Sequence, residues 1–292
     1  MLLNLFQDAS FSFFSFFDSI ELGLYFVIIG YYFLIFAYFM VMRFRISKKL
    51  YWFFFSILFL ALAASRLFFI ITDFYIPELQ GSVSSEQIVG LLMINYRFAT
   101  FCTWMATTFL MGVLGILLFP PDSTLENQEI DKDSHFIIVF IKENETYVRY
   151  FLRICLFIFP LIIGILALTL PDTLIMDPSI PGDYSYSIDL QLIEIAGWSY
   201  PVGRFVLNFI LQPLFVAIVP FIYSYLAWKT FGVLRRSYGL NALGFFIYYV
   251  GRITQGLFEV LNWPHIQAIV PPLLILLALL LIVIANSFET LK

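Results

Sequence analysis

Residues 22–49 read LGLYFVIIGYYFLIFAYFMVMRFRISKK, and this stretch decides the class of fold. Residues 22–42 carry no charge, and four bases follow within residues 43–49. A helix needs about 20 mainly apolar residues to cross the hydrocarbon core of a bilayer. Because Lys and Arg accumulate at the cytoplasmic ends of such helices, the stretch predicts a transmembrane helix that starts outside and ends inside.

The rest of the chain repeats this pattern of long apolar runs and short polar connections. Hydrophobic residues make up 61% of the 292-residue chain and charged residues 12%, which is typical of an integral membrane protein. We predict an all-α membrane protein with one seven-transmembrane-helix domain over residues 1–292. The predicted spans are residues 22–42, 50–74, 88–119, 150–170, 202–228, 240–261 and 266–288, with a cytoplasmic loop at 120–149 and an outer loop at 171–201.

The basic residues predict how the chain is oriented in the bilayer. Twelve of the 16 Lys and Arg residues fall on one side of the spans, and the connections on the other side contain none. The twelve are Arg43, Arg45, Lys48, Lys49, Lys132, Lys142, Arg149, Arg153, Lys229, Arg235, Arg236 and Lys292. With seven spans, this places the N-terminus outside and the C-terminus in the cytoplasm, in a multi-pass protein of the cell membrane. The alternative is a miscounted span, at the third or the seventh.

Several classes of function are excluded by missing chemistry. Retinal attaches to a buried lysine, and no predicted span contains one, so we expect no retinal and no other cofactor. The chain has only two histidines, and they fall in different regions, so neither a metal site nor a catalytic set is expected. A net charge of −4 gives no basic surface for nucleic acid. The layout of seven spans with an outer N-terminus is similar to that of G-protein-coupled receptors, although the sequence hallmarks of that class are missing.

Four arginines fall inside or at the rim of the predicted spans, in their outer halves. A charge in hydrocarbon costs at least about 2.5–3.5 kcal/mol, so each needs a partner or a function. The candidate ligand-binding residues are Arg66, Arg97, Arg204 and Arg252, with the nearby carboxylates Asp73 and Glu259. In one interpretation, ion pairs of Arg66 with Glu259 or of Arg252 with Asp73 hold the bundle together. In the other, the excess of arginines binds an anionic ligand, since guanidinium groups suit carboxylates and phosphates.

The two long loops leave alternatives open. In the cytoplasmic loop, residues 135–150 predict a short hairpin or a helical extension of the fourth span. In the outer loop, residues 188–198 are typical of an amphipathic segment at the interface. That loop is either a lid over the outer face or a plug at the interface.

A basic surface at the inner ends of the helices is the candidate for coupling to a partner. Its residues are Arg43, Arg45, Lys48, Lys49, Lys229, Arg235 and Arg236. They anchor and orient the helices, or they bind a cytosolic signalling protein. Pro213 and Pro220 bend the fifth span between Arg204 and this surface, which offers a route for coupling.

Three hypotheses of function follow. The leading one is a receptor-like sensor that binds a small anionic or amphipathic ligand in its outer half and signals to a separate cytosolic protein. The second is an anion transporter or channel that uses the same arginines. The third is a membrane enzyme that acts on lipid, for which Asp73, Glu259 and His265 are the only plausible group.

Overall fold

The computed structural model describes residues 16–80, 82–119, 145–195, 198–261 and 263–287. Long apolar helices dominate it, as the sequence predicts. Their bounds are α2 Phe16–Ala37, α4 Leu50–Ile70, α5 Ser85–Leu118, α7 Glu145–Thr169, α11 Gln212–Lys229, α12 Gly232–Val260 and α13 Pro264–Ser287. The prediction of an all-α membrane protein is therefore confirmed.

Short segments of altered helix extend three of these helices. The π-helix η1, Tyr38–Phe44, and the short α3, Arg45–Ser47, continue α2, and the π-helix η2, Ile71–Tyr75, continues α4 to the 3-10 turn η3, Pro77–Leu79. Before α11, α10, Val202–Phe205, is followed by the π-helix η4, Val206–Leu211. The continuous helix from 16 to 47 is longer at both ends than the predicted first span.

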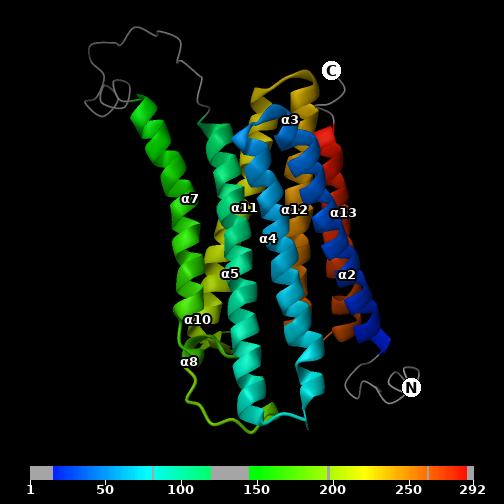
Figure 1. Ribbon diagram of the computed structural model, residues 1–292, viewed down its shortest axis with the longest axis vertical. Coiled ribbons are helices and arrows are strands. Elements are labelled where there is room, and N and C mark those ends of the chain that lie inside the picture. Colours follow the sequence, from blue (N-terminus) through cyan, green and yellow to red (C-terminus); the bar gives the residue numbers. More distant parts are fainter. Residues whose placement is uncertain (1–15, 81, 120–144, 196–197, 262, 288–292) are drawn as a thin grey trace.

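Six helices of the described residues are long and apolar enough to cross a membrane. The predicted sixth span, 240–261, corresponds to α12. This helix has 29 residues, but its mean hydropathy is too low for it to be among the six. Polar residues such as Asn241 and Arg252 lower its hydropathy. It nevertheless packs against α11 and α13 within the bundle (Figure 1). The structure thus supports a multi-pass helical membrane protein.

The long helices run side by side, and successive helices alternate in direction (Figure 1). The end of the bundle that carries α3 also holds the end of α13 at Ser287, and we call it the α3 end. The opposite end, called the α8 end, carries α8, Asp172–Ile175, and α10. The residues at the α3 end include the predicted cytoplasmic bases Lys48 and Lys49.

Aromatic residues fill the bundle toward the α3 end. Phe39 is fully buried and stacks on Trp52, with ring centroids 5.4 Å apart. Phe55 meets Phe39 edge to face at 5.0 Å and Phe245 at 6.4 Å. Together with Phe59 these rings form the inner aromatic cluster, Phe39, Trp52, Phe55, Phe59 and Phe245, which joins α4 to α12. Rings in such arrangements contribute about 0.5–1.5 kcal/mol per pair beyond their burial.

The predicted outer loop folds into short elements. After α8 come α9, Ser179–Asp183, and the antiparallel strands β1, Leu192–Ile195, and β2, Trp198–Pro201. Residues 192–195 read LIEI, and their β-branched and alternating character suits a strand. Ile175 and Met176 are buried against Ile88 and Val89 of α5, so this loop packs on the bundle.

Most of the predicted cytoplasmic loop, including the expected hairpin at 135–150, lies outside the described residues. Its last residues belong to α7, which begins at Glu145. From Glu145 onward, the structure therefore agrees with a helical extension of the fourth span.

Close packing of α12 against α13 depends on Gly244. A Cβ at this position would lie 2.8 Å from Cγ1 of Ile282 and 3.2 Å from the carbonyl oxygen of Ala278. Gly239, on the same helix, has no such neighbour within 4 Å. These two glycines form a matched pair for a test of the interface.

We expect Gly244→Ala to lower the thermal unfolding midpoint in detergent, because overpacking costs about 1–3 kcal/mol. Gly239→Ala is the control, and it is expected to leave the midpoint unchanged or to raise it, since alanine favours a helix by about 1 kcal/mol. Equal midpoints for the two variants would contradict the close α12–α13 contact.

Candidate functional site

Two of the four arginines hold the outer loop on the bundle. Arg97 on α5 forms an ion pair with Asp172, with Nη2 2.6 Å from Oδ1. The same guanidinium donates to the carbonyl oxygens of Leu168, at 3.3 Å, and Leu170, at 2.6 Å. These carbonyls belong to the end of α7 and the residue after it, where helix carbonyls lack partners within the helix. Arg97 therefore caps α7 and fixes the start of α8.

Arg204 on α10 binds the next carboxylate of the loop. Its Nη1 donates to Oδ2 of Asp177, and its guanidinium lies 5.0 Å from the ring centroid of Tyr96. Burial of Asp177 opposes ionisation, but the Arg204 charge and hydrogen bonds from Ser179 outweigh it and lower the pKa of Asp177 below its ordinary value. The sequence did not predict these carboxylate partners.

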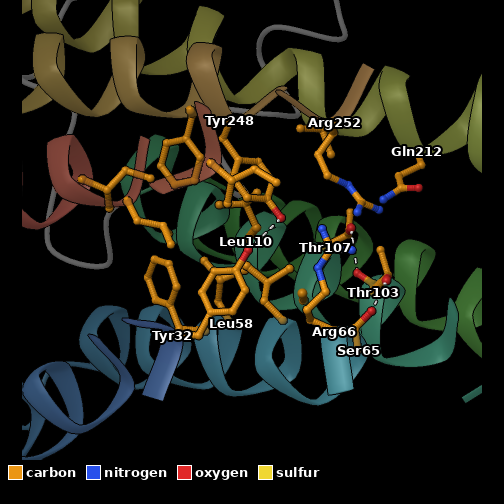
Figure 2. Close-up of a pocket in the computed structure, with 18 of the residues that line it drawn as sticks. Tyr32, Leu58, Ser65, Arg66, Thr103, Thr107, Leu110, Gln212, Tyr248 and Arg252 are labelled. Carbon is orange, nitrogen blue, oxygen red and sulfur yellow. Dashed lines mark hydrogen bonds between the residues drawn. The ribbon is translucent and has the colours of Figure 1, made fainter. Parts of the chain in front are cut away.

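The other two arginines, Arg66 and Arg252, line an internal cavity of about 50 Å³. Residues of α2, α4, α5, α11, α12 and α13 surround it. Figure 2 shows Arg66 and Arg252 reaching into the same polar part of the cavity from opposite walls, with Gln212 beside Arg252. The cavity thus brings together two of the predicted ligand-binding residues.

Arg66 is the most deeply buried charge among them. Its residue is only 6% exposed, and it lies near the middle of the apolar helix Leu50–Leu79. Its Cζ stands 3.9 Å from the ring centroid of Tyr25, a cation–π contact that compensates part of the desolvation. Among the described residues, no hydrogen bond or ion pair of Arg66 is found, and the carboxylates of Glu21 and Asp73 act on its charge from a longer distance.

Arg252 and Gln212 supply donors from the other wall. Arg252 is half-buried on α12, and in the part of the chain that the structure describes no carboxylate pairs with it. Gln212 begins α11, directly after the π-helix η4, and its amide lies beside Arg252 (Figure 2). Such π-helical segments are frequent at functional sites.

The hydroxyl groups around Arg66 are already engaged. Ser65 donates to the carbonyl oxygen of Ala99 at 2.9 Å and meets the Thr103 hydroxyl at 2.6 Å. Thr107 donates to the carbonyl oxygen of Thr103 at 3.1 Å. Tyr32 and Tyr248 face each other with their oxygens 3.4 Å apart (Figure 2). Among the described residues, the guanidinium groups, the Gln212 amide and the Tyr248 hydroxyl are therefore the donors that face the cavity.

Toward the α8 end, Tyr25 separates Arg66 from the outer part of the bundle. Its ring is 2% exposed, and its hydroxyl donates to Glu21 and accepts a hydrogen bond from Gln255 at 3.0 Å. Toward the α3 end, Phe59 and Phe245 of the inner aromatic cluster form the cavity wall. The aromatic rings therefore bound the cavity toward the α3 end.

Beyond the aromatic cluster lies a second buried polar contact. Asn286 of α13 donates to Oδ1 of Asn241 on α12 at 3.0 Å, and Arg43 donates to the carbonyl oxygen of Asn286. The guanidinium of Arg43 also lies 5.1 Å from the ring centroid of Trp52. Arg43 therefore joins three helices, whereas the other predicted coupling residues, Arg45, Lys48, Lys49, Lys229, Arg235 and Arg236, are exposed.

The two predicted carboxylates do not complete the cavity. Asp73 lies in η2 and is exposed, and its charge acts on Arg66; no direct Arg252–Asp73 ion pair is found among the described residues. The Glu259 side chain lies outside the described part of the structure, and so does the expected Arg66–Glu259 pair. His265 is exposed and packs on Phe17. Among the described residues, no group of His, Cys, Asp and Glu residues gathers to bind a metal.

Sequence reasoning selected the arginines and missed the rest of the cavity. Ser65, next to Arg66, and the threonines Thr103 and Thr107, spaced one helical turn apart, are the signals that were available. Tyr25, Tyr32, Tyr248 and Gln212 looked like ordinary residues of apolar spans.

These observations define a multi-pass helical membrane protein with a small, cationic internal cavity. Comparison of the chain with protein-family models, with curated proteins and with solved structures gave no match. The function is therefore proposed below from the geometry of the cavity.

The Arg204–Asp177 pair predicts a dependence of stability on pH. The pKa of Asp177 is lower in the folded protein than in the unfolded chain, where it is about 3.9. Its ionised form therefore stabilises the fold fully above this unfolded pKa, and the stabilisation is lost as the pH falls through the folded pKa. We expect Asp177→Asn to lower the free energy of unfolding by about 1 kcal/mol, equally at about pH 5 and 7, which is seen as a lower thermal midpoint. The difference from the parent is expected to shrink below about pH 4.

The exposed Asp189 of the same loop provides the control. Asp189→Asn is expected to match the parent throughout this pH range. A difference between the parent and Asp177→Asn that grows on acidification would rule out the ion pair as its source.

Proposed function

We propose that this protein is a receptor-like sensor of the cell membrane that binds a small anion in its interior and signals to a separate cytosolic protein. In this proposal seven helices span the bilayer, the N-terminus lies outside and the α3 end faces the cytoplasm. The observation that carries the proposal is that Arg66 and Arg252 face one cavity and that neither forms a direct ion pair among the described residues; Glu21 and Asp73 act on Arg66 only from a longer distance.

Physical chemistry favours an anion between the two guanidinium groups. Two like charges that share a low-dielectric cavity repel each other, and each is costly to bury alone. An anion about 4 Å from a guanidinium gains roughly 4 kcal/mol at an effective dielectric constant of 20. Binding of an anion would therefore offset both the repulsion and part of the desolvation.

The route from the cavity to the cytoplasmic surface supports the sensor hypothesis over the others. Arg252 lies on α12, and the same helix carries Asn241 and the exposed bases Arg235 and Arg236. Asn241 contacts Asn286, which accepts from Arg43. A shift of α12 on anion binding would alter this contact and the basic surface together.

Binding is tested by the thermal stability of the purified protein with chloride, nitrate, acetate, glutamate, sulfate and citrate. We expect at least one anion to raise the midpoint in a saturable way, since a ligand at 100 times its dissociation constant stabilises by about 2.7 kcal/mol. Arg66→Gln and Arg252→Gln are expected to abolish the rise.

Arg97→Gln is the matched control, because it removes another arginine of the bundle whose partners are known. It is expected to lower the midpoint of the ligand-free protein and to keep the anion response. An anion response that survives in both Arg66→Gln and Arg252→Gln would disprove the site.

Signalling is tested by hydrogen exchange of the parent with and without the stabilising anion. We expect altered protection at the inner ends of α11 and α12, around Lys229 and Arg235, as well as around the cavity. Changes confined to the cavity would leave no coupling to the cytoplasmic surface and would remove the sensor hypothesis.

The Asn241–Asn286 contact also favours a second candidate function, anion transport, because it continues polar character inward from the cavity. The inner aromatic cluster lies between the two and blocks that path in this structure. We expect liposomes containing the protein to show no anion efflux above that of empty liposomes. Efflux that Arg66→Gln abolishes would replace the sensor hypothesis by transport.

A further inference from the structure

The size of the cavity limits the ligand. A volume of about 50 Å³ is open to solvent-sized molecules, whereas one water needs roughly 10–15 Å³ by this measure. The space therefore suits a few waters, or one small ion that displaces them. A lipid headgroup, an amino acid or a di- or tricarboxylate exceeds it.

The donors in the cavity limit the charge of the ligand. The donors that face the cavity are the N–H groups of Arg66, Arg252 and Gln212 and the hydroxyl of Tyr248, which accepts from Tyr32. The hydroxyls of Ser65, Thr103 and Thr107 already donate to other groups. The other walls are largely apolar, formed by residues such as Leu62, Phe69 and Ile275. Since the cost of dehydrating an ion rises with the square of its charge, sulfate or phosphate would lose far more hydration than so few donors replace.

We infer that the ligand is a single monovalent inorganic anion of the size of chloride, bromide or nitrate, bound between Arg66 and Arg252 with Gln212 as a further donor. This inference rests on the proposed function and names the chemical class of its ligand. The anion sheds most of its water on entry, and the small volume of the cavity excludes larger solutes.

A size series tests the inference directly. Protein purified in sodium gluconate is titrated at constant ionic strength with chloride, bromide, nitrate, sulfate, glutamate or citrate, and the unfolding midpoint is measured. We expect chloride, bromide and nitrate to raise the midpoint by about 5 °C or more at saturation and the three larger or divalent anions to have no effect.

Two variants calibrate the series. Ala106→Val keeps both arginines and adds two methyl groups at a buried position of the cavity wall. It is expected to weaken nitrate and bromide binding at least tenfold and chloride binding less. Glu86→Gln, which changes an exposed carboxylate in the first turn of α5, is expected to leave every titration unchanged.

A measurement on the parent avoids any dependence on variant folding. Crystals grown in gluconate and soaked in sodium bromide are expected to show one anomalous peak between the guanidinium groups of Arg66 and Arg252. Absence of this peak at a bromide concentration that saturates the thermal shift would place the anion elsewhere and overturn the inference.

The outcomes separate this inference from the proposed function. If glutamate, citrate or sulfate stabilises the parent more than chloride does, and Arg66→Gln abolishes that effect, the anion site stands and the monovalent class is wrong. If no anion shifts the midpoint of the parent, both the site and its ligand class are wrong.

Discussion

The buried guanidinium of Arg66 is the constraint around which the centre of this bundle is organised. Burying one cation to 6% exposure in an apolar helix costs several kcal/mol unless neighbouring groups compensate for the lost hydration. The ring of Tyr25 lies 3.9 Å from the guanidinium and compensates part of this cost, and Glu21 and Gln255 hold that ring through hydrogen bonds with its hydroxyl. The positions of α2, α4 and α12 relative to one another therefore depend on how this charge is accommodated.

The four arginines occupy two kinds of environment within the bundle. Arg97 and Arg204 lie near the α8 end, where the outer loop can reach them with Asp172 and Asp177, and their charges are neutralised by the chain itself. Arg66 and Arg252 lie deeper in the bundle and line one cavity. Depth thus separates arginines that pair with described carboxylates of the loop from arginines that share a cavity.

The sequence was informative about the fold because hydrocarbon imposes a simple rule of length and apolarity on every span. It was less informative at α12, where Asn241 and Arg252 are polar for reasons of packing and site chemistry that composition does not reveal. At the site, the arginines stood out because charge is rare in an apolar chain. Their partners did not, because Asp172 is 75 residues from Arg97 and reaches it only through the fold of the outer loop.

One helix, α12, connects the cavity to the α3 end of the bundle. Between Arg252 and Asn241, α12 carries Tyr248, which faces Tyr32, and Phe245, which belongs to the inner aromatic cluster. A displacement of α12 by a bound anion must therefore either move these packed rings or be resisted by them. Packed aromatic rings have few alternative arrangements. The inner aromatic cluster thus couples the packing of α12 beside the cavity to the packing of the helices at the α3 end.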